Sequence, residues 1–239
     1  MFPKNNPVTR LFSLMNNNVG KRGLSGCVWR SLPAVLTLLF LIFAAEAAAQ
    51  IPITSIEDLQ KIGNDPSYPL DGEYVLTQDI DASATAIWND GAGFAPVGTA
   101  SSRFTGVFDG AGYVISGLFI NRPAEDFVGL FGVVGAGGEI RNVGLESADV
   151  TGAVVVGGLV GGLDSGTVAY CYATGDVEGV AQVGGLVGLN SQGAIEPCYA
   201  AVKVTSTSSD TSAAGGLVGF NSQGAIESCY ATGEVTGSG

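Results

Sequence analysis

Short apolar segments alternate with glycine-rich turns along most of this chain, and from about residue 127 onward the alternation is periodic. A four-residue word, glycine-leucine-apolar-glycine, recurs at intervals of 29, 27 and 31 residues. Two further apolar anchors follow it in each unit, for example IESCYA and then GEVTG in the last one. Each unit therefore predicts three short β-strands separated by turns. The glycines that frame the four words are Gly129, Gly132, Gly158, Gly161, Gly185, Gly188, Gly216 and Gly219.

A single unit of this length cannot bury its apolar side chains, whereas stacked units can. Stacking in register places each strand about 4.8 Å from its counterpart one coil along. It sets Leu186 over Leu217 and Ile195 over Ile226, and the framing glycines allow corners where a β-carbon would clash. The sequence thus predicts an all-β fold, a parallel β-helix (β-solenoid), with repeats starting near residues 127, 156, 183 and 214. Propeller blades need about 40–50 residues, so these units are too short for a β-propeller.

These words resemble the GLUG repeat, which is named for its Gly-Leu-aliphatic-Gly core and occurs in large exported bacterial proteins. The resemblance covers roughly residues 127–237, and the segment FTGVFDGAGYVISGLFI at 104–120 looks like the usual lead-in to such arrays. Relatives of this kind include adhesin-like surface proteins and the non-catalytic region of IgA-protease-type zinc metallopeptidases. The resemblance implies an exported β-solenoid module, but it does not imply one particular ligand.

The first 49 residues follow a different pattern. Basic residues precede an apolar run at 32–45, and small residues follow at Ala47 and Ala49. This order predicts a secretory signal peptide cleaved between Ala49 and Gln50. The alternative is a membrane anchor, but Glu46 ends the apolar run below the roughly 20 residues that a spanning helix needs. We therefore expect a secreted or cell-surface protein with no stable membrane insertion after cleavage.

The segment at 50–103 is expected to form an N-terminal cap with the first strands, and 104–239 to form the solenoid. SIEDLQKIG predicts a short helix that Ser55 caps, with Leu59 and Ile62 facing inward and Gly63 closing it. GEYVLTQDIDAS then predicts a strand that joins the stack. The last repeat has no recognisable cap, which predicts either a fragment of a longer reading frame or self-association through the bare coil.

Charge narrows the range of partners. Only one of the 22 acidic residues but five of the ten basic residues precede Gln50, so 21 acidic residues face five basic ones thereafter. Such a surface argues against binding nucleic acid and anionic membranes, both of which attract basic proteins. It suits a soluble exported protein.

Three cysteines, Cys171, Cys198 and Cys229, occupy one position of the repeat, and Val143 fills the same position in the first copy. A position that accepts valine favours a small apolar side chain, so we expect a buried ladder of free thiols. Disulfides are the alternative in an exported protein, although parallel in-register geometry would strain them. A zinc site is disfavoured because the chain has no histidine and only three candidate thiols.

The absence of histidine also removes Ser-His-Asp and Cys-His nucleophile activation and His-Glu-x-x-His metal motifs. Carboxylates remain at Asp79, Asp81 and Asp109, and the neighbours Glu125 and Asp126 adjoin the first repeat. Paired carboxylates serve glycoside hydrolysis, and parallel β-helices include polysaccharide lyases and hydrolases, so a carbohydrate-active enzyme is the alternative function. The basic residues do not recur in one register, which disfavours it.

Stacked Asn190/Asn221 and Gln192/Gln223 are expected to form hydrogen-bonded ladders that stiffen a corner. The sequence predicts a non-catalytic surface module, adhesin-like or structural, with no catalytic residue, cofactor or metal. An accessory region of a longer surface peptidase is a further alternative. Host or neighbouring-cell proteins and glycans are the candidate partners, and no residue identifies one.

Overall fold

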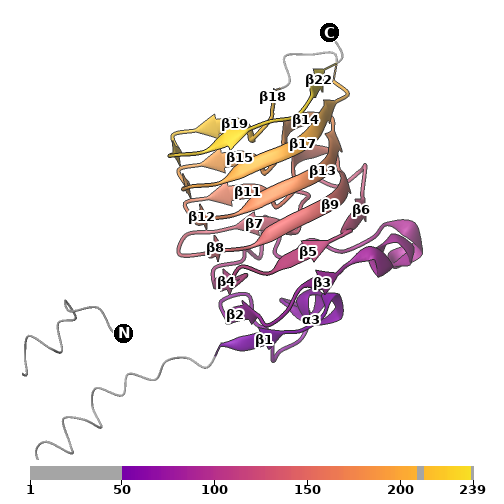
Figure 1. Ribbon diagram of the computed structural model, residues 1–239, viewed down its shortest axis with the longest axis vertical. Helices are drawn as coiled ribbons and strands as arrows, with labels where there is room; N and C mark the ends of the chain where they lie inside the picture. The colour runs from indigo at the N-terminus through magenta and orange to yellow at the C-terminus, as the bar shows by residue number, and fades with distance from the viewer. Residues whose placement is uncertain (1–49, 209–212, 238–239) are drawn as a thin grey trace, which may run out of the picture. The chain divides into compact units, whose positions relative to one another are not determined.

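The computed structural model describes residues 50–208 and 213–237 (Figure 1). The expected signal peptide, which ends at Ala49, lies outside the described residues and remains a prediction. In the part of the chain that is described, no helix is long and apolar enough to cross a lipid bilayer.

The strands pair in parallel with their counterparts in neighbouring coils, which gives four sheets. The seven-stranded sheet contains β1 (Ile51–Ile53), β2 (Glu73–Leu76), β4 (Val107–Asp109), β8 (Glu139–Arg141), β12 (Thr167–Ala169), β16 (Ala194–Ile195) and β20 (Ala225–Ile226). The eight-stranded sheet contains β3 (Ile80–Asp81), β5 (Val114–Ser116), β6 (Phe119–Asn121), β9 (Gly144–Thr151), β13 (Tyr172–Gly179), β17 (Tyr199–Ser206), β21 (Tyr230–Ala231) and β22 (Val235–Gly237).

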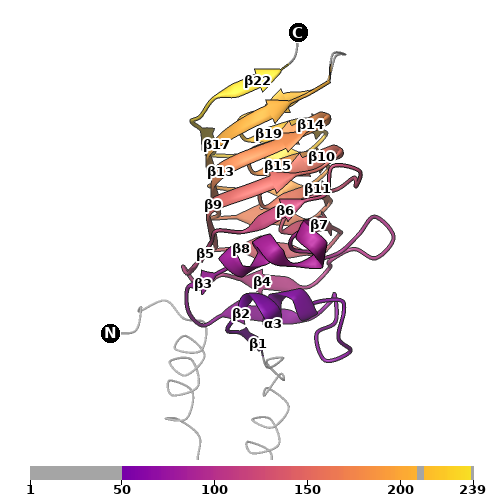
Figure 2. The same cartoon turned by 90° about the vertical axis from the view of Figure 1, so that its right-hand side faces the viewer.

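The two smaller sheets belong to the repeat region. The four-stranded sheet contains β7 (Phe131–Val134), β11 (Val160–Asp164), β15 (Val187–Ser191) and β19 (Val218–Ser222). The three-stranded sheet contains β10 (Val154–Gly157), β14 (Ala181–Gly184) and β18 (Ala214–Gly215). Figures 1 and 2 show the strands of successive coils stacked one above another, so the predicted β-solenoid is confirmed.

The coils β10–β13 and β14–β17 have four strands each where the sequence predicted three. The chain runs from β10 through β11 and β12 to β13, and then repeats the path from β14 to β17. The difference lies at the glycine word that starts at Gly158. The chain bends at Gly158 and Leu159, between the end of β10 at Gly157 and the start of β11 at Val160. A β-carbon at Gly157 would collide with the carbonyl oxygen of Val160. The word is therefore a corner between two strands.

The predicted register is confirmed. Val187 pairs with Val218 and Ile195 pairs with Ile226, each one coil apart. The amide of Leu186 donates a hydrogen bond of 2.9 Å to the carbonyl of Leu217. The first, less similar repeat follows the same register, since Phe131 of β7 pairs with Val160 of β11.

The predicted helix is also confirmed, as α3 (Ile56–Lys61). The hydroxyl of Ser55 accepts a hydrogen bond of 3.3 Å from the amide of Asp58, which is the expected N-cap. Leu59 and Ile62 are buried, and Gly63 follows with a φ of 79°. The helix therefore packs its apolar side on the first coil.

The strand expected at 72–83 was predicted incorrectly as one element. It forms β2 and β3 with a break between them, and two short 3-10 helices follow, η1 (Ser83–Ile87) and η2 (Asn89–Gly91). The break lets the chain pass from the seven-stranded to the eight-stranded sheet. Because β1 and β2 already pair into the seven-stranded sheet, the cap contributes strands to the stack. The boundary at 103/104 remains a prediction.

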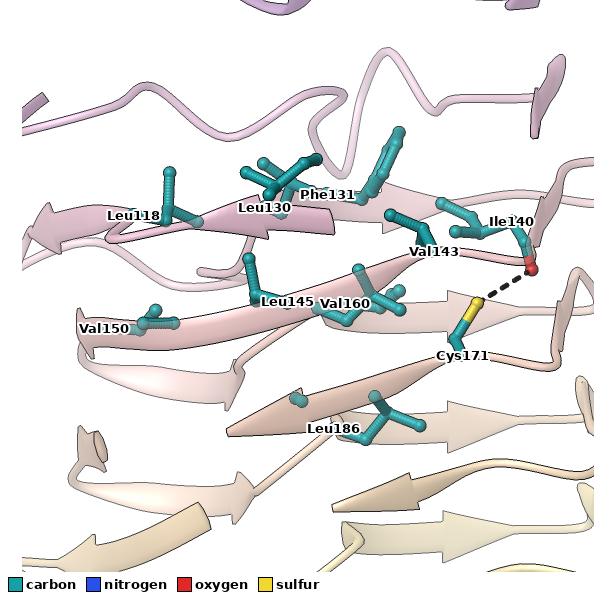
Figure 3. Packing of buried hydrophobic residues seen from close by; sticks show 14 of the residues in the cluster. Leu118, Leu130, Phe131, Ile140, Val143, Leu145, Val150, Val160, Cys171 and Leu186 are labelled. Atoms are coloured by element: carbon teal, nitrogen blue, oxygen red, sulfur yellow. Dashed lines mark hydrogen bonds between the residues drawn. The ribbon is translucent and has the colours of Figure 1, made fainter. Parts of the chain in front are cut away.

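The core is built from columns of apolar residues (Figure 3). One column contains Leu145 and Ala173, and another contains Val150 and Val177, with the next coil adding Ala200 and Val204. Their exposed fractions are 1% or less. Burial of each such aliphatic side chain contributes about 1–3 kcal/mol. No single coil could gain this alone, so the stack folds as a unit.

Gly188 shows why the repeat requires glycine at the end of the word. A β-carbon there would lie 2.7 Å from the amide nitrogen of Val156 and 2.8 Å from the carbonyl oxygen of Gly161. Both obstacles are backbone atoms, which cannot rotate away. By contrast, a β-carbon at Gly237 would meet nothing within 4 Å.

We predict that Gly188→Ala lowers the free energy of unfolding by about 1–3 kcal/mol, since the backbone must shift to accept the methyl group. Urea unfolding followed by circular dichroism measures this. Gly237→Ala is the matched control and should change stability by less than about 0.5 kcal/mol. Equal effects of the two substitutions would contradict the close approach at Gly188.

Candidate functional site

The outer face of the eight-stranded sheet carries the most distinctive side chains of the repeat region. Along β13 the residues alternate, with Ala173 and Val177 buried and Asp176 and Glu178 exposed. This is the alternation expected when one side of a sheet covers a core and the other side meets solvent. Tyr172, at the start of β13, is half-buried on the outward side.

Tyr172, Tyr199 and Tyr230 form a column on this face, which we call the tyrosine ladder. The register of the sheet pairs Tyr172 with Tyr199 and Tyr199 with Tyr230. Their ring centroids are 4.9 Å and 5.2 Å apart, and the rings are parallel to within 1° and 6°. Tyr199 is half-buried, and Tyr230 is 58% exposed. The ladder is thus a continuous aromatic strip that solvent reaches.

The lower end of the ladder is held in place by two contacts. The ring of Tyr172 lies over Gly144 of the preceding coil, where a β-carbon would collide with it. Its hydroxyl donates a hydrogen bond of 2.7 Å to a carboxylate oxygen of Glu146. Burial, and then this hydrogen bond and nearby negative charge, raise the pKa of Tyr172 to about 12. The phenol is therefore protonated at neutral pH and fixed in orientation.

Carboxylates surround the tyrosine ladder on both sides. Lys203 is the one basic residue among the described residues of β9, β13, β17, β21 and β22. Burial, and then repulsion from Asp176, raise the pKa of Asp149, which pairs with Asp176 across the sheet. The face is therefore strongly acidic. Its exposed acidic residues are Glu146, Asp149, Asp176, Glu178 and Glu234, and Glu196 and Glu227 lie on the corner just before the tyrosines.

The tyrosine ladder was missed in the sequence, although a signal was present. The word CYA occurs three times at the second anchor, so the tyrosine recurs together with the cysteine. In a strand, the neighbours of a buried residue point outward. The alternation of inward and outward residues therefore predicts that the tyrosine after each buried cysteine points outward, once in each of these three repeats.

The carboxylates expected to be catalytic candidates do not converge. Asp81 lies on β3 of the eight-stranded sheet and Asp109 lies on β4 of the seven-stranded sheet. Asp79 accepts a hydrogen bond from the amide of Val114 at 2.9 Å, and Asp81 accepts one from the amide of Ser83 at 2.9 Å. These groups hold turns and neighbouring coils together.

The same is true of the acidic pair before the first repeat. Asp126 accepts a hydrogen bond of 3.1 Å from the amide of Val154, one coil along. Glu125 forms an ion pair of 2.8 Å with Arg122. In the described part of the chain, no group of three His, Cys, Asp or Glu side chains is arranged to hold a metal ion.

Asp109 is the most heavily used of these carboxylates. It accepts hydrogen bonds from the amide of Ala111 (2.8 Å), from Arg141 Nε (2.9 Å) and from Asn142 Nδ2 (3.1 Å). Burial alone raises the pKa of Asp109, but these hydrogen bonds and the positive charge of Arg141 outweigh it, so the pKa lies below its ordinary value. Arg141 also pairs with Glu139 at 2.8 Å. The cluster closes the turn after β4.

We predict that Asp109→Ala lowers the free energy of unfolding by about 1–3 kcal/mol at neutral pH, because three donors lose their acceptor. A depressed folded-state pKa gives stability above the unfolded value of about 3.9 that is lost as pH falls through the folded-state value. The variant should therefore lose less stability than the wild type on acidification. Urea unfolding from pH 7 to pH 3 measures both effects.

Glu125→Ala serves as the control, because its ion pair is exposed and should be worth at most about 1 kcal/mol. An Asp109→Ala variant as stable and as acid-sensitive as the wild type would contradict the structural role of this cluster.

The repeated cysteines lie at the corner before the tyrosine ladder. Cys171 and Cys198 are buried, Cys229 is half-buried, and all three are free thiols. The Cys171 thiol lies 3.7 Å from the carbonyl oxygen of Ile140 (Figure 3) and 3.2 Å from that of Ala169. Burial raises the pKa of Cys171 well above its ordinary value. The Cys171 thiol is therefore neutral, as expected of a buried structural cysteine.

The polar ladders form only in part. Gln192 Nε2 donates to Gln223 Oε1 at 3.1 Å, so the predicted glutamine ladder is present. Asn190, which is completely buried, instead accepts a hydrogen bond of 3.0 Å from the amide of Gly193. Asn221 likewise donates to the carbonyl of Gly224 at 3.0 Å. Each asparagine therefore closes its own corner, and Asn190 Nδ2 also donates to the carbonyl of Ala225 in the next coil at 3.5 Å.

The outer face of the four-stranded sheet is apolar. Val133, Leu189 and Phe220 occupy one register position in successive coils, and Gly162 takes that position in the coil between Val133 and Leu189. Phe220 is 46% exposed. A shallow hollow of about 170 Å³ lies beside this stripe. The ion pair between Arg103 and Asp164, at 2.5 Å, borders it.

Comparison with known proteins agrees with this architecture. The family model described as the GLUG motif matches residues 152–178, 179–205 and 210–236. These matches contain the second, third and fourth glycine words. The first word, at 129–132, lies outside them, although β7 stacks under β11 in the same sheet.

Two curated relatives are much longer than this chain. Halomucin of Haloquadratum walsbyi is 43% identical over 146 residues, which is 58% of this chain and 2% of halomucin. A candidate Gly-rich membrane protein of Evansella cellulosilytica is 40% identical over 110 residues, which is 44% of this chain and 13% of that protein.

A solved structure has the same fold. The crystal structure of a candidate immunoglobulin A1 protease from Bacteroides ovatus superposes with a TM-score of 0.58 at 18% sequence identity. The match covers 79% of this chain and 67% of that one. The chain is therefore similar to that structure in fold, a β-solenoid, and residues 152–236 of it contain three matches to the GLUG motif.

Proposed function

We propose that this chain is a non-catalytic module that acts outside the cell, where its outer faces bind partners in an adhesin-like manner or hold them as a scaffold. Solenoids present extended surfaces of regularly spaced side chains, which suit the recognition of large partners. The four sheets give this chain several such faces.

The exposure of the tyrosine ladder is the main support for this proposal. The tyrosine ladder lies on an outer face, so three aromatic rings in a row meet solvent without helping to fill the core. Tyrosine is enriched at protein interfaces, because it offers a large rigid contact area and a hydroxyl group. Its repetition in register at Tyr172, Tyr199 and Tyr230 supports a role in binding.

The proposed location rests on two lines of support. The names halomucin and Gly-rich membrane protein, given to the curated relatives, point to surface or extracellular proteins. The predicted signal peptide at 1–49 agrees with export. Those relatives exceed this chain many times in length, so their whole activities are not transferred to it.

An enzyme is the weaker proposal. The carboxylates that a carbohydrate-active enzyme would use are engaged with backbone amides or arginine, as at Asp81 and Asp109. The chain also has no histidine for nucleophile activation or metal binding. A likeness at 18% identity concerns the fold alone, so the protease activity named for the Bacteroides ovatus protein is not carried over. A place beside a peptidase domain in a longer protein remains compatible with this proposal.

The test is a binding screen with the purified protein. Fluorescently labelled protein is applied to intact cells, immobilised extracellular proteins and a glycan array, and unlabelled protein is the competitor. We expect saturable binding to at least one surface, and we expect the competitor to remove it. Protein unfolded in urea and diluted into the assay is the control for non-specific adhesion.

A clean blank across the panel would contradict a binding function. Turnover of a peptide or polysaccharide by the purified protein would contradict the absence of catalysis.

A further inference from the structure

The last described coil presents open strand edges at one end of the stack (Figure 1). Its strands β18, β19, β20, β21 and β22 pair with β14, β15, β16 and β17 of the coil before it. No described strand pairs with their other edges. We call this surface the end face, and it is separate from the outer faces on which the proposed function rests.

We propose that the end face binds a GLUG coil of a partner polypeptide, which adds in the same parallel register as the coils beneath it. Strand addition to an open sheet edge is a recurring mode of recognition, because the main-chain groups of the edge supply hydrogen bonds and side-chain positions supply selectivity. The end face offers the edges of four sheets together. Its partner is therefore defined by the chemistry of the repeat itself.

The columns of the core are open at the end face, which is the first argument. Ile195 has an exposed fraction of 0%, whereas Ile226, which pairs with it one coil along, is 40% exposed. Val204 and Val235 differ in the same way, at 0% and 44%. Leu217 is also only partly buried. A further coil with aliphatic residues at these positions would bury them, and burial of apolar area favours binding.

The first glycine of each glycine word supplies the second argument, because it faces the coil that follows. A β-carbon at Gly158 would lie 2.7 Å from the carbonyl oxygen of Gly185, and one at Gly185 would collide with the carbonyl oxygen of Gly216. At Gly216 a β-carbon would meet only the side chains of Ala231, at 3.0 Å, and Val235, at 3.7 Å. Glycine at this position therefore leaves the space that the carbonyl group of a further glycine word needs. The end face has the backbone clearance of a surface inside the stack.

A second copy of this chain fits the end face less well. At the other end of the stack, α3 lies beside β1 and β2 and buries Ile56 and Leu59 (Figure 2), so that end presents no open coil. Two copies that met through their end faces would wind in opposite senses along the common axis. Their four sheets could not all continue from one copy into the other, whereas a coil in parallel register continues every sheet.

The experiment offers the full chain one of its own coils as a peptide. The fluorescently labelled peptide spans residues 181–206, which form β14 to β17, and carries Cys198→Val to prevent disulfide formation. We expect saturable binding by fluorescence anisotropy. A peptide that also carries Gly188→Ala is the control, because a β-carbon at Gly188 lies 2.7 Å from the backbone of the coil beneath it. It should bind roughly tenfold more weakly or worse.

Two variants of the full chain, each checked for folding by circular dichroism, assign the binding to the end face. Gly216→Ala should weaken binding of the peptide roughly tenfold or more, because the added methyl group fills the space for the incoming carbonyl. Within the chain this methyl group meets only side chains, so the fold should persist. Gly237→Ala is the matched control on the same coil. Ser206 occupies the equivalent position one coil before, so this variant should bind the peptide as the wild type does.

Absence of binding, or equal affinities for the two peptides, would overturn the inference, since the register would not be recognised. Wild-type affinity in Gly216→Ala would also overturn it. Concentration-dependent dimers of the chain alone in analytical ultracentrifugation, abolished by Gly216→Ala, would show that a second copy occupies the end face instead. The cell-surface screen tests the outer faces, so its outcome is independent of this one, and Gly216→Ala should leave binding in that screen unchanged.

Discussion

The structure depends on one constraint, the in-register parallel pairing of each coil with the next. In the repeat region, strands pair with counterparts 27 to 31 residues away, as β13 does with β9 and β17. A coil has too little apolar surface to fold alone, so its stability comes from its neighbours. Glycines in and next to the word make the pairing possible, because Gly188 and Gly157 lie where the backbones of adjacent strands or coils come too close for a β-carbon.

This constraint turns each position of the repeat into a column of like residues. An inward position becomes a continuous core, as with Val150, Val177 and Val204. An outward position becomes a strip on the surface, and repetition multiplies its chemistry. One tyrosine per coil produces an aromatic ladder, and one or two carboxylates per coil produce an acidic face. The candidate binding surface is thus a direct product of stacking, and no loop had to be shaped for it.

The fold could be predicted because its signals are local and repeated. The spacing of the glycine words predicted the register in which Ile195 pairs with Ile226. The capping residue Ser55 predicted where the helix begins. The fourth strand of the coils β10–β13 and β14–β17 was not predicted, because a bend such as that at Gly158 is not distinguishable from a strand glycine in a linear pattern. The tyrosine ladder was not predicted, because a single tyrosine per coil is unremarked until stacking aligns its ring with those of the neighbouring coils. The sequence could not show that Asp79 binds the amide of Val114 or that Asp109 binds Arg141, since these partners lie 35 and 32 residues away in other coils.

Amide hydrogen exchange resolved to single residues tests the stacking most directly. In a parallel strand, alternate amides bond to opposite neighbours. Since β13 lies between β9 and β17, the account predicts slow exchange at consecutive residues along it. In β19, which pairs with β15 alone among the described strands, slow and fast amides should alternate. Alternation within β13, or fast exchange throughout it, would contradict a solenoid held together by its coils.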